Sequence, residues 1–183
     1  DILTNQPIDA LQYSITEGYT PLRNWVKEDL AKKNMFDKNE DEVVITSGAQ
    51  QAIEVVTKEI CNEGDVIICE APTFIGSLNS FRSYNAKLVG VEMEEDGINI
   101  EKLEEALKKY QRTAFIYLIP NFQNPTGKTM SLEKRKQVLA LAEKYNVYIL
   151  EDNPYGELRY FGEDISSIKS LDKTGKVLYV GSF

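Results

Sequence analysis

The stretch FIYLIPNFQNPTG, Phe115–Gly127, limits most strongly how this chain can fold. Its first five residues are almost continuously apolar, which is typical of a strand buried on both faces of a parallel sheet. Two prolines and three side-chain amides follow and end the strand. A buried strand that runs into an amide-rich, restricted loop suggests a site for a small polar ligand. The same residue types dominate ordinary turns, so the stretch alone leaves a plain strand-to-helix connection open.

The bulk composition excludes several classes of function. The chain has 183 residues, a net charge of −8 and no histidine. The lack of histidine excludes His-based triads and His-ligated zinc, and we expect no metal site. No basic run points to nucleic acid, and no long apolar run points to a membrane. Cys61 and Cys69 are too far apart for a CxxC motif, so we expect two small buried residues in a cytoplasmic protein.

Strand and helix patterns alternate along most of the chain. The predicted strands are Val43–Thr46, Val66–Cys69, Lys87–Val91, Phe115–Ile119, Val147–Leu150 and Lys176–Val180. The predicted helices begin at Thr20 as an N-cap followed by Pro21, after Ser47-Gly48, near Ile75, near Ile100 and after Ser131 as an N-cap. Six strands with helical connections predict an α/β fold with three α/β/α layers around a mainly parallel sheet. We expect one domain over residues 21–183, preceded by an arm or interface segment over residues 1–20.

Five of the predicted strands end in polar loops. The loops are Ser47–Gln50, Ala71–Phe74, Asn121–Gly127, Glu151–Tyr155 and Gly181-Ser182. The carboxyl ends of parallel strands share one edge of a sheet, so these loops can converge on one crevice. The first loop suits an anion, because free N–H groups and the helix dipole meet there, although a plain helix start also fits. It is neither a GxGxxG nor a Walker A sequence, so nucleotide binding is not indicated.

Three further side chains suggest what the crevice holds. Asp152 follows an apolar strand, where a carboxylate needs a cationic partner or a raised pKa, unless it serves as a turn or N-cap. Tyr155 offers a phenol nearby, and Phe74 offers a flat ring, although such an aromatic is often part of the core. Together with the anion site, these side chains suit a phosphorylated, flat heterocycle that can bind a proton.

At this point the sequence resembles a known family. VVITSGAQQAI, CEAPTF, PNFQNPTGKTMSLEKR, ILEDNPYGELRY and YVGSF are similar to segments of the fold-type I aminotransferases that use pyridoxal 5′-phosphate (PLP). The nearest branch contains the 2-aminoadipate, kynurenine and aromatic aminotransferases, and the similarity runs from about Tyr13 to Phe183. The resemblance implies transfer of an amino group between an amino acid and a 2-oxo acid in a homodimer. It also identifies this chain as most of the PLP-binding large domain.

The resemblance assigns roles around the PLP ring. Phe74 would stack on the ring, while Asn124 and Tyr155 would hydrogen-bond the ring 3′-oxygen. Asp152 would pair with the ring nitrogen and keep it protonated, so that the ring accepts electrons when the substrate Cα–H bond breaks. Asp152 and Tyr155 are therefore the expected catalytic residues.

The resemblance also assigns residues to the PLP phosphate. Gly48, Ala49 and Gln50, which follow the predicted strand Val43–Thr46, would hold the phosphate. Ser182, which follows the predicted strand Lys176–Val180, would be a further phosphate ligand. Tyr13 matches a tyrosine that crosses the dimer interface to the phosphate of the neighbouring subunit.

One departure and two alternatives remain. In the family, the Schiff-base lysine lies two residues beyond the position of Phe183, and a small domain follows. The chain is thus expected to be a segment of a longer protein and inactive by itself. One alternative is the PLP-sensing domain of a winged-helix transcription regulator, although those regulators typically carry an aromatic residue at the position of Asn124. A fold-type I lyase is the other.

Overall fold

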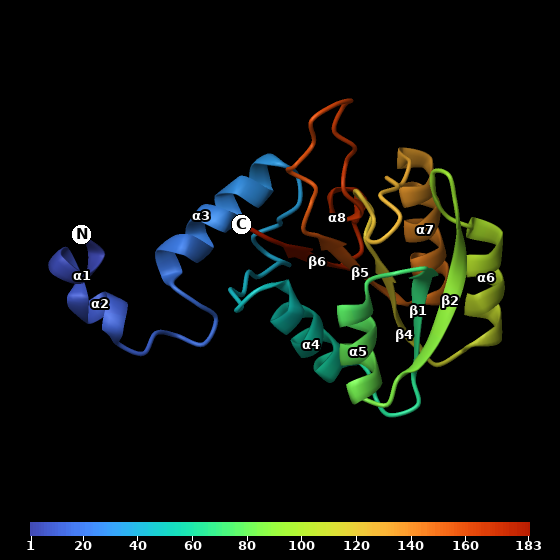
Figure 1. The fold of residues 1–183 in the computed structure, drawn as a ribbon, viewed down its shortest axis with the longest axis horizontal. Helices are drawn as coiled ribbons and strands as arrows, with labels where there is room; N and C mark the ends of the chain where they lie inside the picture. Colours follow the sequence, from blue (N-terminus) through green and yellow to red (C-terminus); the bar gives the residue numbers. More distant parts are fainter. The chain divides into compact units, whose positions relative to one another are not determined.

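The computed structural model describes all 183 residues, which divide into two compact units, Asp1–Thr46 and Ser47–Phe183. The first unit contains the helices α1 (Ile2–Asn5), α2 (Pro7–Leu11) and α3 (Thr20–Lys32) (Figure 1). The two short helices were not predicted. The N-cap of α3 is Tyr19 instead of Thr20, which is already helical, with Pro21 in the first turn. The division at residue 20 that the sequence suggests stays a prediction.

The prediction of a strand at Val43–Thr46 is wrong. These residues have no regular secondary structure and pair with no strand. The Val43 carbonyl accepts a hydrogen bond from Arg23 Nε at 2.8 Å, and the Ile45 N–H donates to the Glu17 carbonyl at 2.9 Å. The backbone of this β-branched run therefore forms hydrogen bonds with a side chain and with a loop. Without a neighbouring strand, β propensity alone does not form a sheet.

The second unit is built on one six-stranded sheet with the order β3-β2-β1-β4-β5-β6. Its strands are β1 (Val66–Ala71), β2 (Lys87–Glu94), β3 (Gly97–Ile98), β4 (Thr113–Leu118), β5 (Tyr148–Asn153) and β6 (Val177–Gly181). All neighbours are parallel except β2 and β3, which form a short hairpin. The predicted α/β class and mainly parallel sheet are confirmed. The chain reverses its direction of travel across the sheet between β1 and β4, where open parallel sheets bind ligands.

Helices cover both faces of this sheet, which confirms three layers (Figure 1). They are α4 (Ala49–Ile60), α5 (Ile75–Ser83), α6 (Ile100–Lys109), α7 (Leu132–Tyr145) and α8 (Ile168–Leu171). Side chains alternate along each strand, so β4 sends Ile116 and Leu118 into a core beneath α6, α7 and α8. It sends Phe115 and Tyr117 into a second core beneath α4 and α5.

Two of the predicted helices begin with a side-chain cap. The Ser131 hydroxyl accepts a hydrogen bond from the Lys134 N–H at 3.3 Å and caps α7, and Asn99 caps α6 in the same way. Both cysteines are buried and unpaired. None of the helices has the length and apolar character needed to span a membrane.

Candidate cofactor site

A cavity of about 250 Å³ opens at the carboxyl edge of the sheet. Its walls come from the start of α4, the loop after β1, the loop after β4 and the end of β5. The lining residues are Ala49, Gln50, Ile53, Phe74, Ile119, Asn124, Asp152, Pro154 and Tyr155. Six of the nine residues that the sequence predicts for the cofactor therefore line one cavity: Ala49, Gln50, Phe74, Asn124, Asp152 and Tyr155.

Asp152 is the ionisable side chain at the floor of this cavity. It is only 4% exposed, and its Oδ2 accepts a hydrogen bond of 2.7 Å from the Tyr117 hydroxyl. Its other oxygen, Oδ1, is buried and has no hydrogen-bond partner. Burial raises the pKa of Asp152 to about 6, against the opposing effect of the Tyr117 hydrogen bond. A buried carboxylate oxygen that lacks a donor and lies at a cavity is suited to a ligand that carries an N–H.

Tyr117 orients this carboxylate from beneath. The Ser77 hydroxyl donates to the Tyr117 oxygen at 2.8 Å, and the tyrosine donates onward to Asp152. The phenol is fully buried, and burial together with the charge of Asp152 raises its pKa, so it stays protonated and remains a donor. Sequence reasoning treated Tyr117 only as part of a buried strand. A phenol within a run of aliphatic residues was the available signal, because a buried hydroxyl needs a partner.

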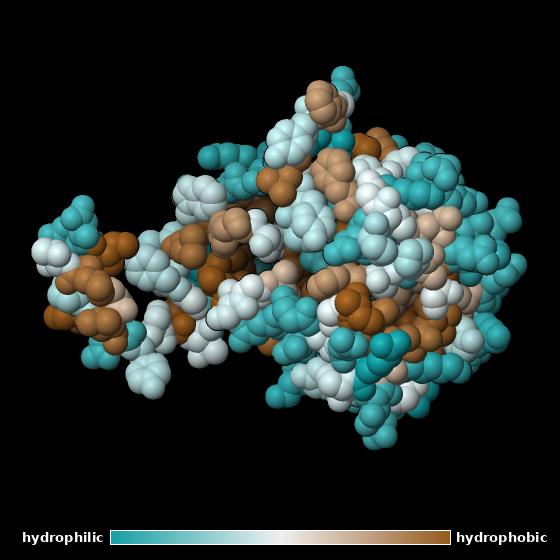
Figure 2. Space-filling view, in the orientation of Figure 1, coloured by the Kyte–Doolittle hydropathy of each residue, from teal (hydrophilic) through white to brown (hydrophobic).

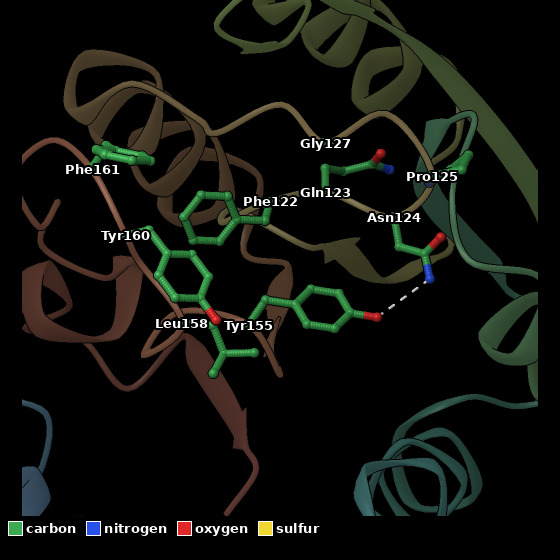
Figure 3. Close-up of a pocket in the computed structure, with 9 residues that line it drawn as sticks. All are labelled: Phe122, Gln123, Asn124, Pro125, Gly127, Tyr155, Leu158, Tyr160 and Phe161. Carbon is green, nitrogen blue, oxygen red and sulfur yellow. Dashed lines mark hydrogen bonds between the residues drawn. The ribbon is translucent and has the colours of Figure 1, made fainter.

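Asn124 and Tyr155 come together at the mouth of the site. The Asn124 side-chain amide donates to the Tyr155 hydroxyl at 3.5 Å, and Figure 3 shows the two groups pointing at each other. They also contribute to a second, larger cavity of about 670 Å³. The other residues of its wall are mainly apolar or aromatic: Phe122, Gln123, Pro125, Gly127, Leu158, Tyr160 and Phe161 (Figure 3). The Arg159 guanidinium lies 4.9 Å from the centre of the Phe122 ring.

The start of α4 forms another wall of the first cavity. Gly48 is its N-cap and has φ 82° and ψ 163°, a conformation that is essentially restricted to glycine. A Cβ at this position would meet nothing within 4 Å, so backbone conformation and not crowding calls for glycine. The Gln50 side chain donates to the Gly76 carbonyl at 3.3 Å and also to the Ser80 hydroxyl. These bonds hold the first turn of α4 against α5.

Phe74 presents its ring to the cavity over a glycine. A Cβ added to Gly76 would lie 2.5 Å from the Phe74 ring, so the ring packs directly on the bare backbone of α5. This contact gives the ring a defined position, as a stacking platform requires.

Three predicted residues do not line the cavity. Gly48 precedes the lining residues of α4, and Ser182 follows β6 at the same edge of the sheet. Tyr13 belongs to the first unit and is fully exposed. Their roles toward a cofactor stay predictions.

Hydrogen-bonded polar side chains support the site from behind; two of them are buried and two are half-buried, and the sequence analysis gave none of them this role. The buried Arg135 guanidinium donates to the Asn121 side-chain oxygen at 2.7 Å. The Asn121 amide donates to Asn153 at 2.7 Å, and the Asn153 amide donates to the Tyr179 hydroxyl at 2.9 Å. These hydrogen bonds connect the loop after β4 with the end of β5 and with the middle of β6. The amides that follow the strands were the available signal in the sequence, because amides near buried strands need partners.

Comparison with known proteins supports the resemblance seen in the sequence. The family model "Aminotransferase class I and II" matches residues 7–183. Aromatic-amino-acid aminotransferase 1 of Thermococcus litoralis is 40% identical over all of this chain, which covers 45% of that protein. The kynurenine aminotransferase of Pyrococcus horikoshii, solved with PMP and kynurenine, is 38% identical, with a TM-score of 0.93 over all of this chain and 46% of that one.

The relatives also include a regulator. An uncharacterized HTH-type transcriptional regulator of Bacillus subtilis is 31% identical over 98% of this chain and 37% of its own length. The chain thus spans less than half the length of the relatives that it matches. The match of the family model to residues 7–183 shows that the chain belongs to the class I and II aminotransferase family.

Proposed function

We propose that the protein catalyses PLP-dependent transfer of an amino group between an amino acid and a 2-oxo acid, and that this chain holds the cofactor. The single observation that carries the proposal is Asp152 Oδ1, a buried carboxylate oxygen without a donor at the floor of a cavity. A protonated pyridine nitrogen is the donor that it lacks. The relatives of known structure include a kynurenine aminotransferase solved with PMP, a form of this cofactor.

The remaining walls fit the rest of the cofactor. Phe74 would stack on one face of the ring, and the Asn124 and Tyr155 polar groups, 3.5 Å apart, would hydrogen-bond its 3′-oxygen. Backbone N–H groups at the start of α4, from Gly48 to Gln50, would hold the phosphate with the helix dipole behind them. Ser182, which follows β6 at the same edge, is proposed as a further phosphate ligand.

Asp152 has the main electrostatic task. With a pKa of about 6, it is mostly ionised at pH 7 and able to hold a proton on the ring nitrogen. Tyr117 fixes the orientation of the carboxylate, so that Oδ1 is directed to the ligand. When bound, PLP supplies the electron sink for cleavage of the substrate Cα–H bond. The low-dielectric surroundings of Asp152 strengthen its interaction with the protonated ring.

We further propose that the protein works as a homodimer in the cytoplasm. Exposed apolar side chains gather on α1 and α2, where Ile2, Leu3, Ile8 and Leu11 are each at least 65% exposed (Figure 2). Such a surface suits burial against a second copy. Tyr13, which follows these helices, would reach the phosphate of that copy. The two free, buried cysteines suit a reducing compartment.

The test uses the protein at its full natural length, reconstituted with PLP and supplied with 2-aminoadipate, glutamate, aromatic and branched-chain amino acids in turn. Release of a 2-oxo acid by wild type, and its loss in Asp152→Ala with PLP still bound, would support the proposal. Failure of wild type to bind PLP would refute it.

The alternative is a PLP-sensing regulator. In that case PLP would bind, no 2-oxo acid would appear with any donor, and a basic winged-helix sequence would precede this chain. Asn124 favours the enzyme, because those regulators typically carry an aromatic residue there.

A further inference from the structure

A second buried carboxyl group lies near the proposed cofactor site and has no role in it so far. Glu70, on β1, is 2% exposed, and its Oε1 is buried without a hydrogen-bond partner. Its Oε2 accepts hydrogen bonds from the Ile119 N–H at 3.1 Å and from the Gln123 side-chain amide at 3.3 Å. Both donors lie in the segment that follows β4, which ends at Leu118. Glu70 thus connects β1, near its carboxyl end, with the segment that follows β4.

Gln123 extends this connection on both sides. Its amide also donates to the Pro72 carbonyl at 2.8 Å, in the loop that leads from β1 to Phe74. Its Oε1 accepts from the Thr126 N–H at 3.0 Å and from the Thr126 hydroxyl at 2.7 Å, within the loop that carries Asn124. One side chain therefore ties together two of the loops that line the cavity. We call Glu70 and Gln123 together the β1–β4 brace.

The position of the brace in the topology gives it a specific consequence. It spans β1 and β4, between which the chain reverses its direction across the sheet. No helix crosses over between these neighbours to fix their loops, since α5 leads from β1 to β2 and α7 leads from β4 to β5. The separation between Phe74 and Asn124 at the cavity is thus left to side-chain contacts such as these.

The charge state of Glu70 fits a mechanical role. Burial, together with repulsion from Asp152, raises the pKa of Glu70 to about 8. The ionisable groups that interact electrostatically with Glu70 are Asp152 on β5, Tyr117 on β4 and Cys69 beside it on β1. Near neutral pH the side chain is therefore mostly a neutral acid, which an amide can replace.

We propose that Glu70 is a positioning residue of the cofactor site, which acts with Gln123 to fix the spacing between the ring-stacking Phe74 and the hydrogen-bonding Asn124. The inference rests on the proposed function, because these two residues need a ring between them. The shape and hydrogen bonds of the acid are what the brace requires, and its negative charge is not.

The experiment measures the Kd for PLP by absorbance titration, at pH 7 and at the full natural length of the protein. In Glu70→Ala and in Gln123→Ala, we expect Kd to rise at least tenfold and the near-ultraviolet circular dichroism of bound PLP to weaken. Glu70→Gln should rescue both signals to within about threefold of wild type. The double variant should be little worse than either single one, because the two residues act as one unit.

Glu151→Ala is the matched control. Glu151 is also a fully buried glutamate on a central strand, and it accepts two backbone hydrogen bonds, from Ile168 at 2.9 Å and Lys169 at 2.8 Å. Those bonds lead to α8 and not to the cavity. The control should lose stability in urea while the folded protein keeps a Kd within about twofold of wild type.

Three results would overturn the inference while the proposed function stands. The first is a wild-type Kd for PLP in Glu70→Ala, and the second is an equal loss in Glu70→Gln and Glu70→Ala. The third is an equal loss in Glu151→Ala, because general destabilisation would then explain the effect. If wild type itself binds no PLP, the proposed function fails first.

Discussion

Replacing Tyr117 by phenylalanine tests how the fold holds the Asp152 carboxylate. The variant keeps the ring, which packs edge-on against Phe81 with centroids 5.2 Å apart. It removes the hydroxyl that donates to Asp152 at 2.7 Å and accepts from Ser77 at 2.8 Å. Both oxygens of Asp152 then lack a donor in the protein, because Oδ1 has none already.

The expected loss follows from these two bonds. A hydrogen bond to a charged group contributes about 1.5–3 kcal/mol, and a neutral one about 1 kcal/mol. We therefore expect the free energy of unfolding without cofactor to fall by roughly 2–4 kcal/mol at pH 8. For a chain of this size, that lowers Tm by roughly 4–16 °C.

The loss should depend on pH in a defined direction. The Tyr117 hydrogen bond lowers the pKa of Asp152, so it stabilises the ionised carboxyl more than the neutral one. Removing it raises the pKa of Asp152 further, and the folded variant then binds a proton that wild type has released. The stability difference between wild type and variant should thus grow as the pH rises through about 6.

The assay is urea unfolding of both proteins at pH 5 and pH 8, together with a carboxyl-carbon NMR titration of Asp152. Ser83→Ala is a suitable control, because its hydroxyl bonds only the Ser80 carbonyl within α5. An equal loss at both pH values, or an unchanged pKa of Asp152, would show that the hydroxyl does not favour the ionised form.

Three further predictions concern single positions. Glu70 has a pKa of about 8 in the fold against an ordinary value of 4.5, so its favourable contribution is complete below about pH 4.5 and disappears as the pH rises to 8. Glu70→Gln should remove up to about 4 kcal/mol of this pH dependence. If the free energy of unfolding changed equally between pH 5 and pH 8.5 in wild type and variant, the assignment would be contradicted. Gly48→Ala should cost about 1–3 kcal/mol through its φ alone, and thermal unfolding with no loss would mean that the backbone relaxes. Ser131→Ala should cost about 1 kcal/mol through the lost cap of α7, measured by urea unfolding against Ser166→Ala, whose side chain caps no helix.

Local patterns predicted the framework well where one type of side chain repeats along an element. The buried run that begins at Phe115 became a central strand, and the helix predicted near Ile75 begins at Ile75. Val43–Thr46 failed because a strand needs a partner, and its partner cannot be found in four residues. The two-residue strand β3 was too short to show a period.

The candidate site could be predicted only in part. Asp152, Asn124 and Tyr155 were identified because each follows an apolar strand and matches a family motif. Tyr117 and Glu70 were not, since the family resemblance assigns neither of them a role and their hydrogen-bond partners are 35 and 53 residues away. Pairings over such separations depend on strand order and tilt, which the residues of one strand do not contain.

The alternation of side chains along β4 has a consequence for how this protein can vary. Tyr117 shares its side of the sheet with Phe115, while Ile116 and Leu118 occupy the other. Deleting a single residue ahead of Tyr117 would send the phenol under α7 and put an aliphatic group beneath Asp152. The packing of the core and the hydrogen bond to Asp152 would then be lost together. Insertions in the loops that precede the amino ends of the strands leave this parity untouched and lie at the edge of the sheet away from the site, so length changes are tolerable there and not within β4.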